Sequence, residues 1–387
     1  MEKATEHNVQ WKTLKIGDCC SSELGKTLDE CRNTGKYRPY LCALNVLWGK
    51  IDTTIIKQMR IEDEELNRYL VKKGDLLVCE GGEIGRCAIW DSDDEIYYQN
   101  ALHRVRFYDD YDSIFFMYLL CYYNDLNLIE KFGKGLTIKH LNQASFRSIP
   151  VSVPSLPVQR RIAAILSSAD KEIEQTRQLI SKYKSIKQGM MEDLLKPKEG
   201  WKKVKLGKVC EPSSEKYNPL TESLYQYCIE MENINQESGT INGKSDITKL
   251  LSLKTKFHKG EVLYGKLRPY LRKYWLADFD GACSTEIWVL KSAENIDNRF
   301  LFYLFQSEFI NRIANLSSGT KMPRADWKLM ATQEVSIPYK DNKPDFNEQH
   351  RIAKILSGID RKIEAEEKVL EKYEKIKKGL MERLLKE

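Results

Sequence analysis

The chain contains two copies of one long segment, separated by a fixed distance. Residues 159–195 align without a gap with residues 349–385 at an offset of 190 residues, and the segments that begin at Trp11 and Trp201 share this offset. Both long copies lack proline, and their apolar residues are spaced alternately by three and four, which is typical of a coiled-coil helix. A helix of about 37 residues is about 55 Å long and cannot bury its apolar stripe alone. The sequence therefore predicts two globular segments, each followed by a long helix.

The two long helices are each other's expected partners. Only a short linker, residues 196–200, separates the first helix from the second globular segment, so the second helix has to return along the first. The pair is therefore expected to be antiparallel, with a pseudo-two-fold between the halves. One lysine in each copy, Lys187 or Lys377, interrupts the apolar pattern. The expected seam consists of Leu166, Ile173, Ile180, Tyr183 and Leu194 in the first helix and of Leu356, Ile363, Leu370, Tyr373 and Leu384 in the second.

The globular segments are expected to contain both helices and strands. Matched turn–strand units occupy residues 73–78 and 259–264, and aromatic runs at 115–120 and 300–305 favour helices. The predicted fold class is α+β: two mixed α/β globular domains separated by two long helices that form an antiparallel coiled coil, with an internal duplication. The expected boundaries are 1–155 for the first globular domain, 156–196 for the first long helix, 197–345 for the second globular domain and 346–387 for the second long helix.

Composition sets few limits on function. The net charge is +6 with an isoelectric point of about 8.6, which permits a polyanionic partner but does not require one. The 10 cysteines form no Cys-x-x-Cys pair, so we expect buried free thiols rather than a metal site or disulfides. The N-terminal residues have no apolar signal core, and no stretch approaches 18 apolar residues. A cytoplasmic protein without a membrane segment is expected.

The sequence does not match the common motifs of catalytic sites. Gly243-Lys244-Ser245 lacks the upstream glycine of a phosphate-binding loop, and the chain has no G-x-G-x-x-G, G-x-S-x-G or H-E-x-x-H motif. Asp345, Glu366 and Lys368 have a nuclease-like spacing, but two of them lie on the second long helix, where they would face solvent or the partner helix. Five histidines form no cluster. We therefore predict no catalytic and no metal-binding residues.

Glycine-rich and basic segments are the candidates for DNA contact. Residues 133–140 and 318–324 occupy corresponding places in the two halves, as do residues 80–86 and 266–274. Glycine permits close backbone approach, and Lys, Arg and Thr side chains contact phosphates or base edges. For each loop alone, a solvated surface loop is an equally ordinary interpretation. The candidate DNA-binding residues are Arg86, Lys134, Thr137, Lys139, Lys266, Arg268, Arg272, Thr320, Lys321 and Arg324.

The chain resembles the specificity subunit of Type I restriction-modification systems. Residues 157–166 and 348–356 are similar to the family's entry into its helices, and residues 187–195 and 377–385 are similar to the helix ends. Thr137-Ile138-Lys139-His140-Leu141 also resembles a family segment. One departure from two-fold symmetry is a six-residue excess, Lys340 through Asp345, before the second helix.

The resemblance implies two target recognition domains that each read half of a split sequence in double-stranded DNA. It implies that the helix pair is a spacer and a docking platform for methyltransferase (modification) subunits. Those partners would bring S-adenosylmethionine, and a restriction and translocase subunit would bring ATP and Mg²⁺, whereas this chain would bind no cofactor. Two alternatives remain open: a bivalent DNA-binding regulator without an enzymatic partner, and, third, a protein-binding scaffold.

Overall fold

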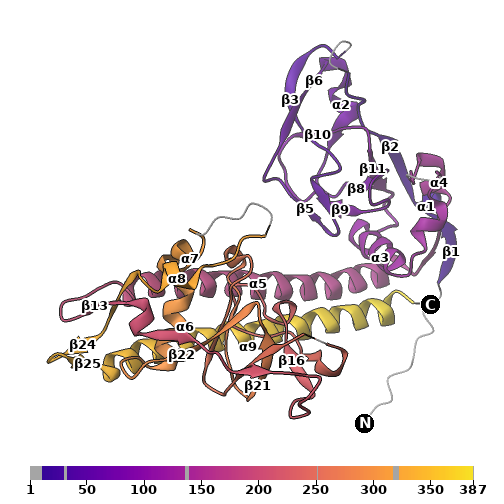
Figure 1. Cartoon of the computed structure of the whole chain (residues 1–387). Coiled ribbons are helices and arrows are strands. Elements are labelled where there is room, and N and C mark those ends of the chain that lie inside the picture. Colours follow the sequence, from indigo (N-terminus) through magenta and orange to yellow (C-terminus); the bar gives the residue numbers. More distant parts are fainter. Residues whose placement is uncertain (1–10, 30–32, 136–138, 251, 317–321, 387) are drawn as a thin grey trace, which may run out of the picture. The chain divides into compact units, whose positions relative to one another are not determined.

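The chain divides into two compact units that each combine a globular domain with parts of both long helices. The computed structural model describes residues 11–29, 33–135, 139–250, 252–316 and 322–386. Unit 1 comprises Met1–Arg177 and Val369–Glu387, and unit 2 comprises Gln178–Lys368 (Figure 1).

The globular part of unit 1 contains two four-stranded sheets and one long helix. One sheet has the order β2-β11-β8-β9 and the other the order β6-β3-β10-β7. Helix α3 (Ser113–Asp125) packs on the first sheet, and its start is fixed by Asp112, whose side chain accepts a hydrogen bond from the Phe115 N–H. A short antiparallel pair, β1 (Lys12–Lys15) with β12 (Pro150–Val153), brings the chain to the long helix. The sheet strands are β2 (Cys20–Leu24), β3 (Lys36–Leu41), β6 (Lys57–Ile61), β7 (Leu70–Val71), β8 (Leu76–Cys79), β9 (Cys87–Ile89), β10 (Ile96–Tyr98) and β11 (Leu102–Phe107).

Unit 2 repeats this plan with a different second sheet. Its first sheet has the order β14-β22-β19-β20 and its second the order β15-β18-β21-β16-β17. Helix α6 (Asn298–Gln306) begins at Asp297, whose side chain accepts from the Arg299 and Phe300 N–H groups. The strands are β13 (Lys202–Lys205), β14 (Cys210–Pro212), β15 (Lys216–Tyr217), β16 (Tyr227–Ile229), β17 (Ser245–Asp246), β18 (Lys254–Phe257), β19 (Val262–Gly265), β20 (Tyr274–Leu276), β21 (Gly281–Ser284), β22 (Ile287–Ser292) and β23 (Glu334–Ile337).

Strand pairing shows the duplication directly. In unit 1, β11 is antiparallel to both β2 and β8, and in unit 2, β22 is antiparallel to both β14 and β19. In the second sheets, β10 is parallel to β3 and antiparallel to β7, as β21 is parallel to β16 and antiparallel to β18. The expected α+β fold class with an internal duplication is therefore confirmed.

Matched glutamines join the long helices to the globular domains. The long helices are α5 (Leu156–Leu194) and α9 (Phe346–Leu384), of 39 residues each. The Gln159 side chain of α5 is 1% exposed and accepts from the Asp112 N–H at 2.9 Å, whereas the Gln349 side chain of α9 is 0% exposed and accepts from the Asp297 N–H at 2.7 Å. Each long helix therefore starts against the cap residue of the helix in its own globular domain.

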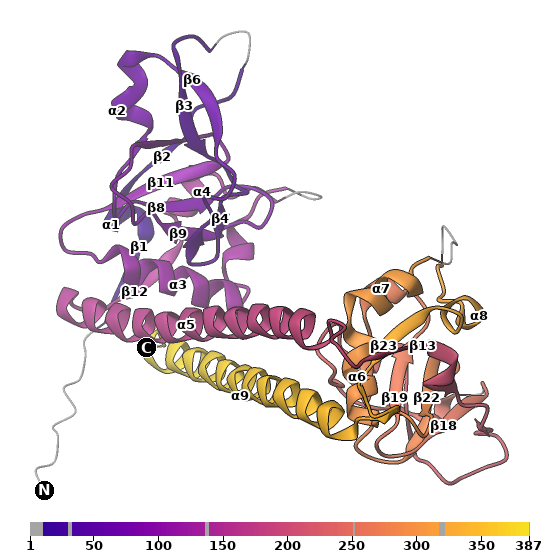
Figure 2. The ribbon, with the colours of Figure 1, turned by 90° about the vertical axis from the view of Figure 1, so that its left-hand side faces the viewer.

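Within each unit, the segments of α5 and α9 run antiparallel (Figure 2). In unit 1, Asp170 pairs with Lys377 and, seven residues later, Arg177 pairs with Glu374. In unit 2, Lys184 pairs with Glu367 and Lys187 with Asp360, so positions rise on one helix as they fall on the other. Along both helices, the side chains of the expected seam are buried or half-buried: Leu166, Ile173, Ile180, Tyr183, Leu194, Leu356, Ile363, Leu370, Tyr373 and Leu384.

The six-residue excess in the second half forms a small hairpin. Strands β24 (Tyr339–Lys340) and β25 (Lys343–Pro344) are joined by Asp341 and Asn342, whose φ angles are 48° and 59°. Two positive φ angles are what a tight two-residue hairpin turn requires, and Asp and Asn accept them readily. Asp345 then accepts a hydrogen bond from the Glu348 N–H at 3.1 Å at the start of α9.

The described residues contain mostly buried cysteines. Nine described cysteines are free, and seven of them are buried; burial raises the pKa of Cys19 to about 11 and that of Cys20 to about 12. Across the same residues, no helix is long and apolar enough to cross a membrane.

Candidate nucleic-acid interface

Two of the loops predicted to meet DNA lie together in unit 1. The loop between β8 and β9, residues 80–86, receives a hydrogen bond from the Leu141 N–H at the carbonyl of Glu80, with a length of 2.7 Å. The second loop is closed at its base by two backbone hydrogen bonds between Lys134 and His140, of 2.9 and 2.8 Å. A Cβ atom placed on Gly81 would lie 3.3 Å from the His140 ring, a tight contact that the ring would have to relieve by moving a few tenths of an ångström, so the two loops pack closely here.

Unit 2 places the corresponding loops in the same relation. The loop between β19 and β20 is tied to the segment that follows residue 321 by two hydrogen bonds. The Arg268 N–H donates to the Pro323 carbonyl at 2.7 Å, and the Ala325 N–H donates to the Lys266 carbonyl at 2.8 Å. The fold therefore brings two loops together within each unit, whereas the sequence comparison had only matched each loop with its counterpart in the other half.

The β19–β20 loop of unit 2 has an unusual backbone. Arg268 and Arg272 have φ angles of 51° and 49°, and they flank a single 3₁₀ turn, Pro269–Leu271. A non-glycine residue in the left-handed region costs roughly 1–3 kcal/mol and persists only where its surroundings fix it. Arg272 provides that fixation, because its guanidinium donates to the Gln306 carbonyl at 2.7 Å and pairs with Glu308.

Arg268 and Tyr270 are the side chains that this rigid loop presents to solvent. Tyr270 is 54% exposed, and Arg268 is also exposed. Within the part of the chain that the structure describes, Arg268 has no ion pair, and its backbone alone is hydrogen-bonded to the neighbouring segment. A planar guanidinium held on a fixed backbone can form paired hydrogen bonds to a base edge or a phosphate.

The other cationic residues predicted to contact DNA differ in whether their side chains already bind groups within the protein. Arg86 donates to the Ala43 carbonyl at 2.7 Å, Lys139 pairs with Glu130 at 3.0 Å, and Arg324 forms two hydrogen bonds to Glu286 of 3.0 and 3.1 Å. Lys134 is exposed and Lys266 is half-buried. Three further predicted contacts lie outside the described residues: Thr137, Thr320 and Lys321.

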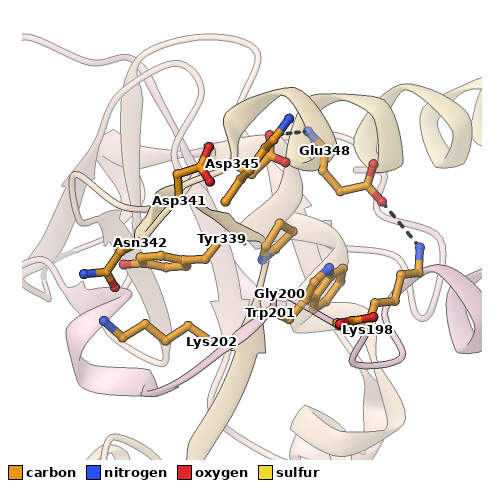
Figure 3. A pocket seen from close by; sticks show the side chains of 12 residues that line it. Lys198, Gly200, Trp201, Lys202, Tyr339, Asp341, Asn342, Asp345 and Glu348 are labelled. Carbon is orange, nitrogen blue, oxygen red and sulfur yellow. Dashed lines mark hydrogen bonds and ion pairs between the residues drawn. The ribbon is translucent and has the colours of Figure 1, made fainter.

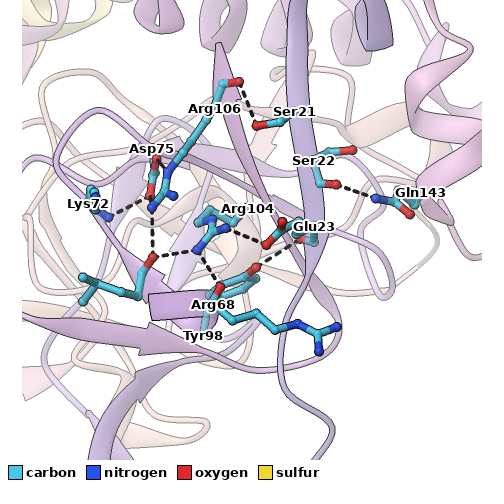
Figure 4. Close-up of polar contacts among 11 residues, drawn as sticks. Ser21, Ser22, Glu23, Arg68, Lys72, Asp75, Tyr98, Arg104, Arg106 and Gln143 are labelled. Atoms are coloured by element: carbon cyan, nitrogen blue, oxygen red, sulfur yellow. Dashed lines mark hydrogen bonds and ion pairs between the residues drawn. The ribbon is translucent and has the colours of Figure 1, made fainter. Parts of the chain in front are cut away.

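A partly buried ionic network in unit 1 was not foreseen from the sequence (Figure 4). Arg104 of β11 is 5% exposed; it donates to Glu23 at 2.7 Å and to the Leu70 carbonyl at 2.8 Å. Arg106 forms two hydrogen bonds to Asp75 of 2.7 and 2.9 Å. Because Leu70 belongs to the other sheet, the network joins the two sheets. The sequence signal that could have revealed this network is the pair of arginines at alternate positions, which lie on one face of a strand.

The described residues also test two other kinds of site. A cavity of about 730 Å³ lies in unit 2 beside the β24–β25 hairpin (Figure 3). Two of the lysines that line it already contact its walls: Lys198 pairs with Glu348 at 3.4 Å, and the Lys202 ammonium lies 5.2 Å from the centre of the Tyr339 ring. We assign no ligand to it. No group of three or more His, Cys, Asp or Glu side chains that could hold a metal occurs among the described residues.

Comparison with known proteins gives the family. A model of the Type I restriction modification DNA specificity domain matches twice, at residues 8–182 and 198–375. The chain belongs to the Type I restriction-modification specificity subunits. Members of this family are the non-catalytic DNA-recognition subunits of Type I restriction enzymes.

Curated specificity subunits are similar over nearly the whole chain. The EcoDI specificity subunit of Escherichia coli is 23% identical, over 91% of this chain and 81% of the relative. The MjaVIII specificity subunit of Methanocaldococcus jannaschii is 26% identical, over 97% of this chain and 92% of the relative.

Solved specificity-subunit structures have the same fold. The S subunit of the Type I system from M. genitalium superposes with a TM-score of 0.62 at 18% identity, covering 100% of this chain and 98% of that one. A chain from a study of complex assembly and conformational transition in a Type I system gives a TM-score of 0.56 at 15% identity, with 97% of both chains covered.

Proposed function

We propose that this specificity subunit recognises a bipartite sequence in double-stranded DNA, one half-site per globular domain, and recruits modification subunits to it. The observation that carries the proposal is the pair of loops at one place in each domain, on frames with the same strand pairing but with different side chains. A repeated frame with different loop chemistry is what two readers of two different half-sites need.

Loop chemistry supports a different half-site for each domain. In unit 2, Arg268 and Tyr270 are exposed, and an arginine paired to the O6 and N7 atoms of guanine is the commonest specific base contact. In unit 1, the corresponding loop contains Gly81 and Gly82, and a Cβ atom on Gly82 would meet nothing within 4 Å. Glycines at that position allow the backbone itself to approach a groove.

Exposed apolar side chains on the long helices support partner docking. Ile186 of α5 is 38% exposed and Ile376 of α9 is 43% exposed, and the two positions are related by the 190-residue repeat. Val369, at the position equivalent to Leu179, is 37% exposed. Equivalent apolar positions on two helices suit two copies of one partner. In the proposed assembly, the modification subunits bring S-adenosylmethionine, and the restriction and translocase subunit brings ATP and Mg²⁺.

Exchanging one domain tests the proposal. Residues 1–155 are replaced by the corresponding domain of another specificity subunit, and adenine methylation is mapped across a genome for the native and the chimaeric protein. We expect one half-site to change while the other half-site persists. Methylation in which both half-sites or neither changed would contradict the assignment of one reader to each domain.

The same experiment separates the proposal from its alternative. A bivalent regulator without an enzymatic partner would occupy a bipartite site on DNA, but the cell would show no methylation that depends on this chain. Deleting the gene provides the control, because the mapped methylation must disappear with it.

A further inference from the structure

A lysine of unit 2 is buried in the helix seam at a position where the heptad pattern calls for an apolar residue. Lys187 of α5 is 8% exposed, and its ammonium donates to one carboxylate oxygen of Asp360 at 2.7 Å and to Gln306 Oε1 at 2.8 Å. Tyr303 of α6 donates its hydroxyl to the other oxygen of Asp360 at 2.7 Å, and its ring centre lies 5.8 Å from Lys187 Nζ. We call Lys187, Asp360 and Tyr303 the second clamp.

Unit 1 contains the same arrangement with the two long helices exchanged. Lys377 of α9 donates to one oxygen of Asp170 at 2.6 Å. Tyr118 of α3 donates to the other oxygen at 2.7 Å, and its ring centre lies 5.5 Å from Lys377 Nζ. Burial raises the pKa of Tyr118, as it does that of Tyr303, so both hydroxyls stay protonated donors. Lys377, Asp170 and Tyr118 form the first clamp.

The two clamps correspond residue by residue. The lysines and the aspartates are each related by 190 residues, and the tyrosines by 185. Around them the sequence differs: Gln306, whose side-chain oxygen accepts a hydrogen bond from Lys187 in the second clamp, corresponds to Cys121 in the first unit. Lys377, the lysine of the first clamp, is accordingly only half-buried. The same three side chains are therefore found twice in surroundings that are not the same.

Clamp geometry depends on the axial register of the helices. Each clamp takes one residue from α5, one from α9 and one from the helix of the globular domain. Sliding one long helix by a heptad would move its residue by about 10 Å, which separates the ammonium from the carboxylate. An apolar seam residue would instead find a new apolar partner after such a slide. A buried polar group in a coiled coil lowers stability, and its best-attested role is to specify register.

We propose that the two clamps are positioning elements that fix the register of the helix pair and the seating of each recognition domain on it, and so select the separation of the two half-sites. This inference rests on the proposed function, because a half-site separation has meaning only for a bipartite target. One base pair changes that separation by about 3.4 Å and turns the duplex by about 34°. A slide of about 10 Å corresponds to about three base pairs, which the accompanying turn of the duplex reduces to one or two, so a register that is not fixed would admit gaps one or two base pairs longer or shorter.

The test removes the polar pairs without removing their bulk. Lys187→Met and Lys377→Met are combined in one specificity subunit, which is assembled with its modification subunits. Initial methylation rates are measured on duplexes that carry both half-sites with the gap varied by up to two base pairs in each direction. We expect the preference for the native gap over gaps one base pair longer or shorter to fall at least tenfold, while both half-site sequences are retained.

A matched control removes ion pairs between the same helices at exposed positions. Lys184 and Arg177 pair across the helices with Glu367 and Glu374 at 2.9 and 2.6 Å, but both are more than half exposed. The double variant Lys184→Met with Arg177→Met should keep the gap preference within twofold of the native value. A clamp variant that also kept it within twofold would overturn the proposal. Tyr303→Phe with Tyr118→Phe retains the rings and serves if the methionine variants fail to assemble.

A measurement without DNA separates this inference from the proposed function. Hydrogen exchange of the free protein should be at least tenfold faster in residues 356–364 of α9 for Lys187→Met, and unchanged for Lys184→Met. If the native complex methylated no bipartite site, the proposed function would fail, and this exchange would still decide whether the clamp holds the register. Unchanged exchange in the clamp variant would refute the register role by itself.

Discussion

At the residue scale, the described arginines of the loops proposed to contact DNA differ in whether their side chains are already bound within the protein. Arg272 and Arg324 were predicted to contact DNA, but their guanidinium groups are bound to Glu308 and to Glu286. Arg268 is exposed, and it has no ion pair among the described residues. The sequence could not separate the three, because their acidic partners lie 36–38 residues away and are chosen by the fold.

Replacing Arg268 is expected to relax one position of one half-site. Arg268→Ala should reduce discrimination at that base pair by about 1–3 kcal/mol, as measured by competition binding with single-base variants of the site. Arg268→Lys keeps the charge but loses the paired hydrogen bonds, so it should retain affinity and still lose discrimination. Discrimination that survived in both variants would exclude Arg268 as a base reader.

Neutralising Lys139 is expected to weaken binding without changing the sequence that is read. Lys139→Gln should lower affinity for every duplex and reduce the slope of log affinity against log salt by about one, if the ammonium exchanges Glu130 for a phosphate. The same expectation applies to Lys321, which lies outside the described residues. An equal change in a Lys372→Gln control, at an exposed position on α9, would show that only net charge matters.

At the element scale, the sequence predicted the long helices, but it did not predict the contacts of the two lysines in their seam. Heptad spacing is a local property, so the seam could be written down from positions such as Leu166 and Leu356, which are 0% exposed. Lys187 and Lys377 were interpreted as interruptions of that seam. They are instead the basic members of the two clamps, and they could not be recognised because each clamp combines residues from three separate helices.

The same substitution at two isoleucines of α5 should impair recruitment in both cases but lower the unfolding temperature in only one. Ile180 is 7% exposed in the seam, and Ile180→Asp would bury an unpaired charge at a cost of several kcal/mol. The unfolding temperature should fall, and recruitment of the modification subunits should fail. Ile186→Asp changes an exposed side chain, so it should leave the unfolding temperature nearly unchanged but weaken recruitment.

Thermal unfolding combined with co-purification of the modification subunits separates these cases. A stable, fully assembling Ile180→Asp protein would contradict the seam. An Ile186→Asp protein that bound its partners normally would contradict docking at that position.

At the scale of the whole molecule, the duplication accounts for most of what the sequence revealed. It placed corresponding turn–strand units at residues 73–78 and 259–264, where β8 and β19 are found. It also paired the loops that the fold brings together. It could not reveal the structure of features confined to one half. The Arg104 network of unit 1 has no second copy to mark it, and the six-residue excess of unit 2 could be located but not recognised as the β24–β25 hairpin.

Lengthening both long helices tests whether they measure the gap between half-sites. One heptad added in register to each helix preserves the seam and lengthens it by about 10 Å. At about 3.4 Å per base pair, up to about three more base pairs could separate the half-sites. Three pairs would also turn the duplex by about 100°, so an increase of one or two is expected if the domains or the DNA adjust.

Mapped methylation should show both half-site sequences with a longer unread gap. An active protein with an unchanged gap would contradict the role of the helices as a ruler. Adding four residues to each helix, which rotates the seam away from its partner, is the control that should abolish assembly.

The contact that Gln159, and equally Gln349, makes between a long helix and its globular domain has a consequence for how these genes can recombine. Each glutamine recognises main-chain atoms, the N–H of Asp112 or Asp297 and the carbonyl of Pro154 or Asn295, rather than any particular side chain. A gene segment that encoded a different globular domain, but kept these main-chain positions, would still present the groups that the unchanged glutamine of the long helix binds. With one half-site read by each domain, as proposed above, recombination between genes of this family would replace one half of the target sequence in a single event and leave the other half unchanged.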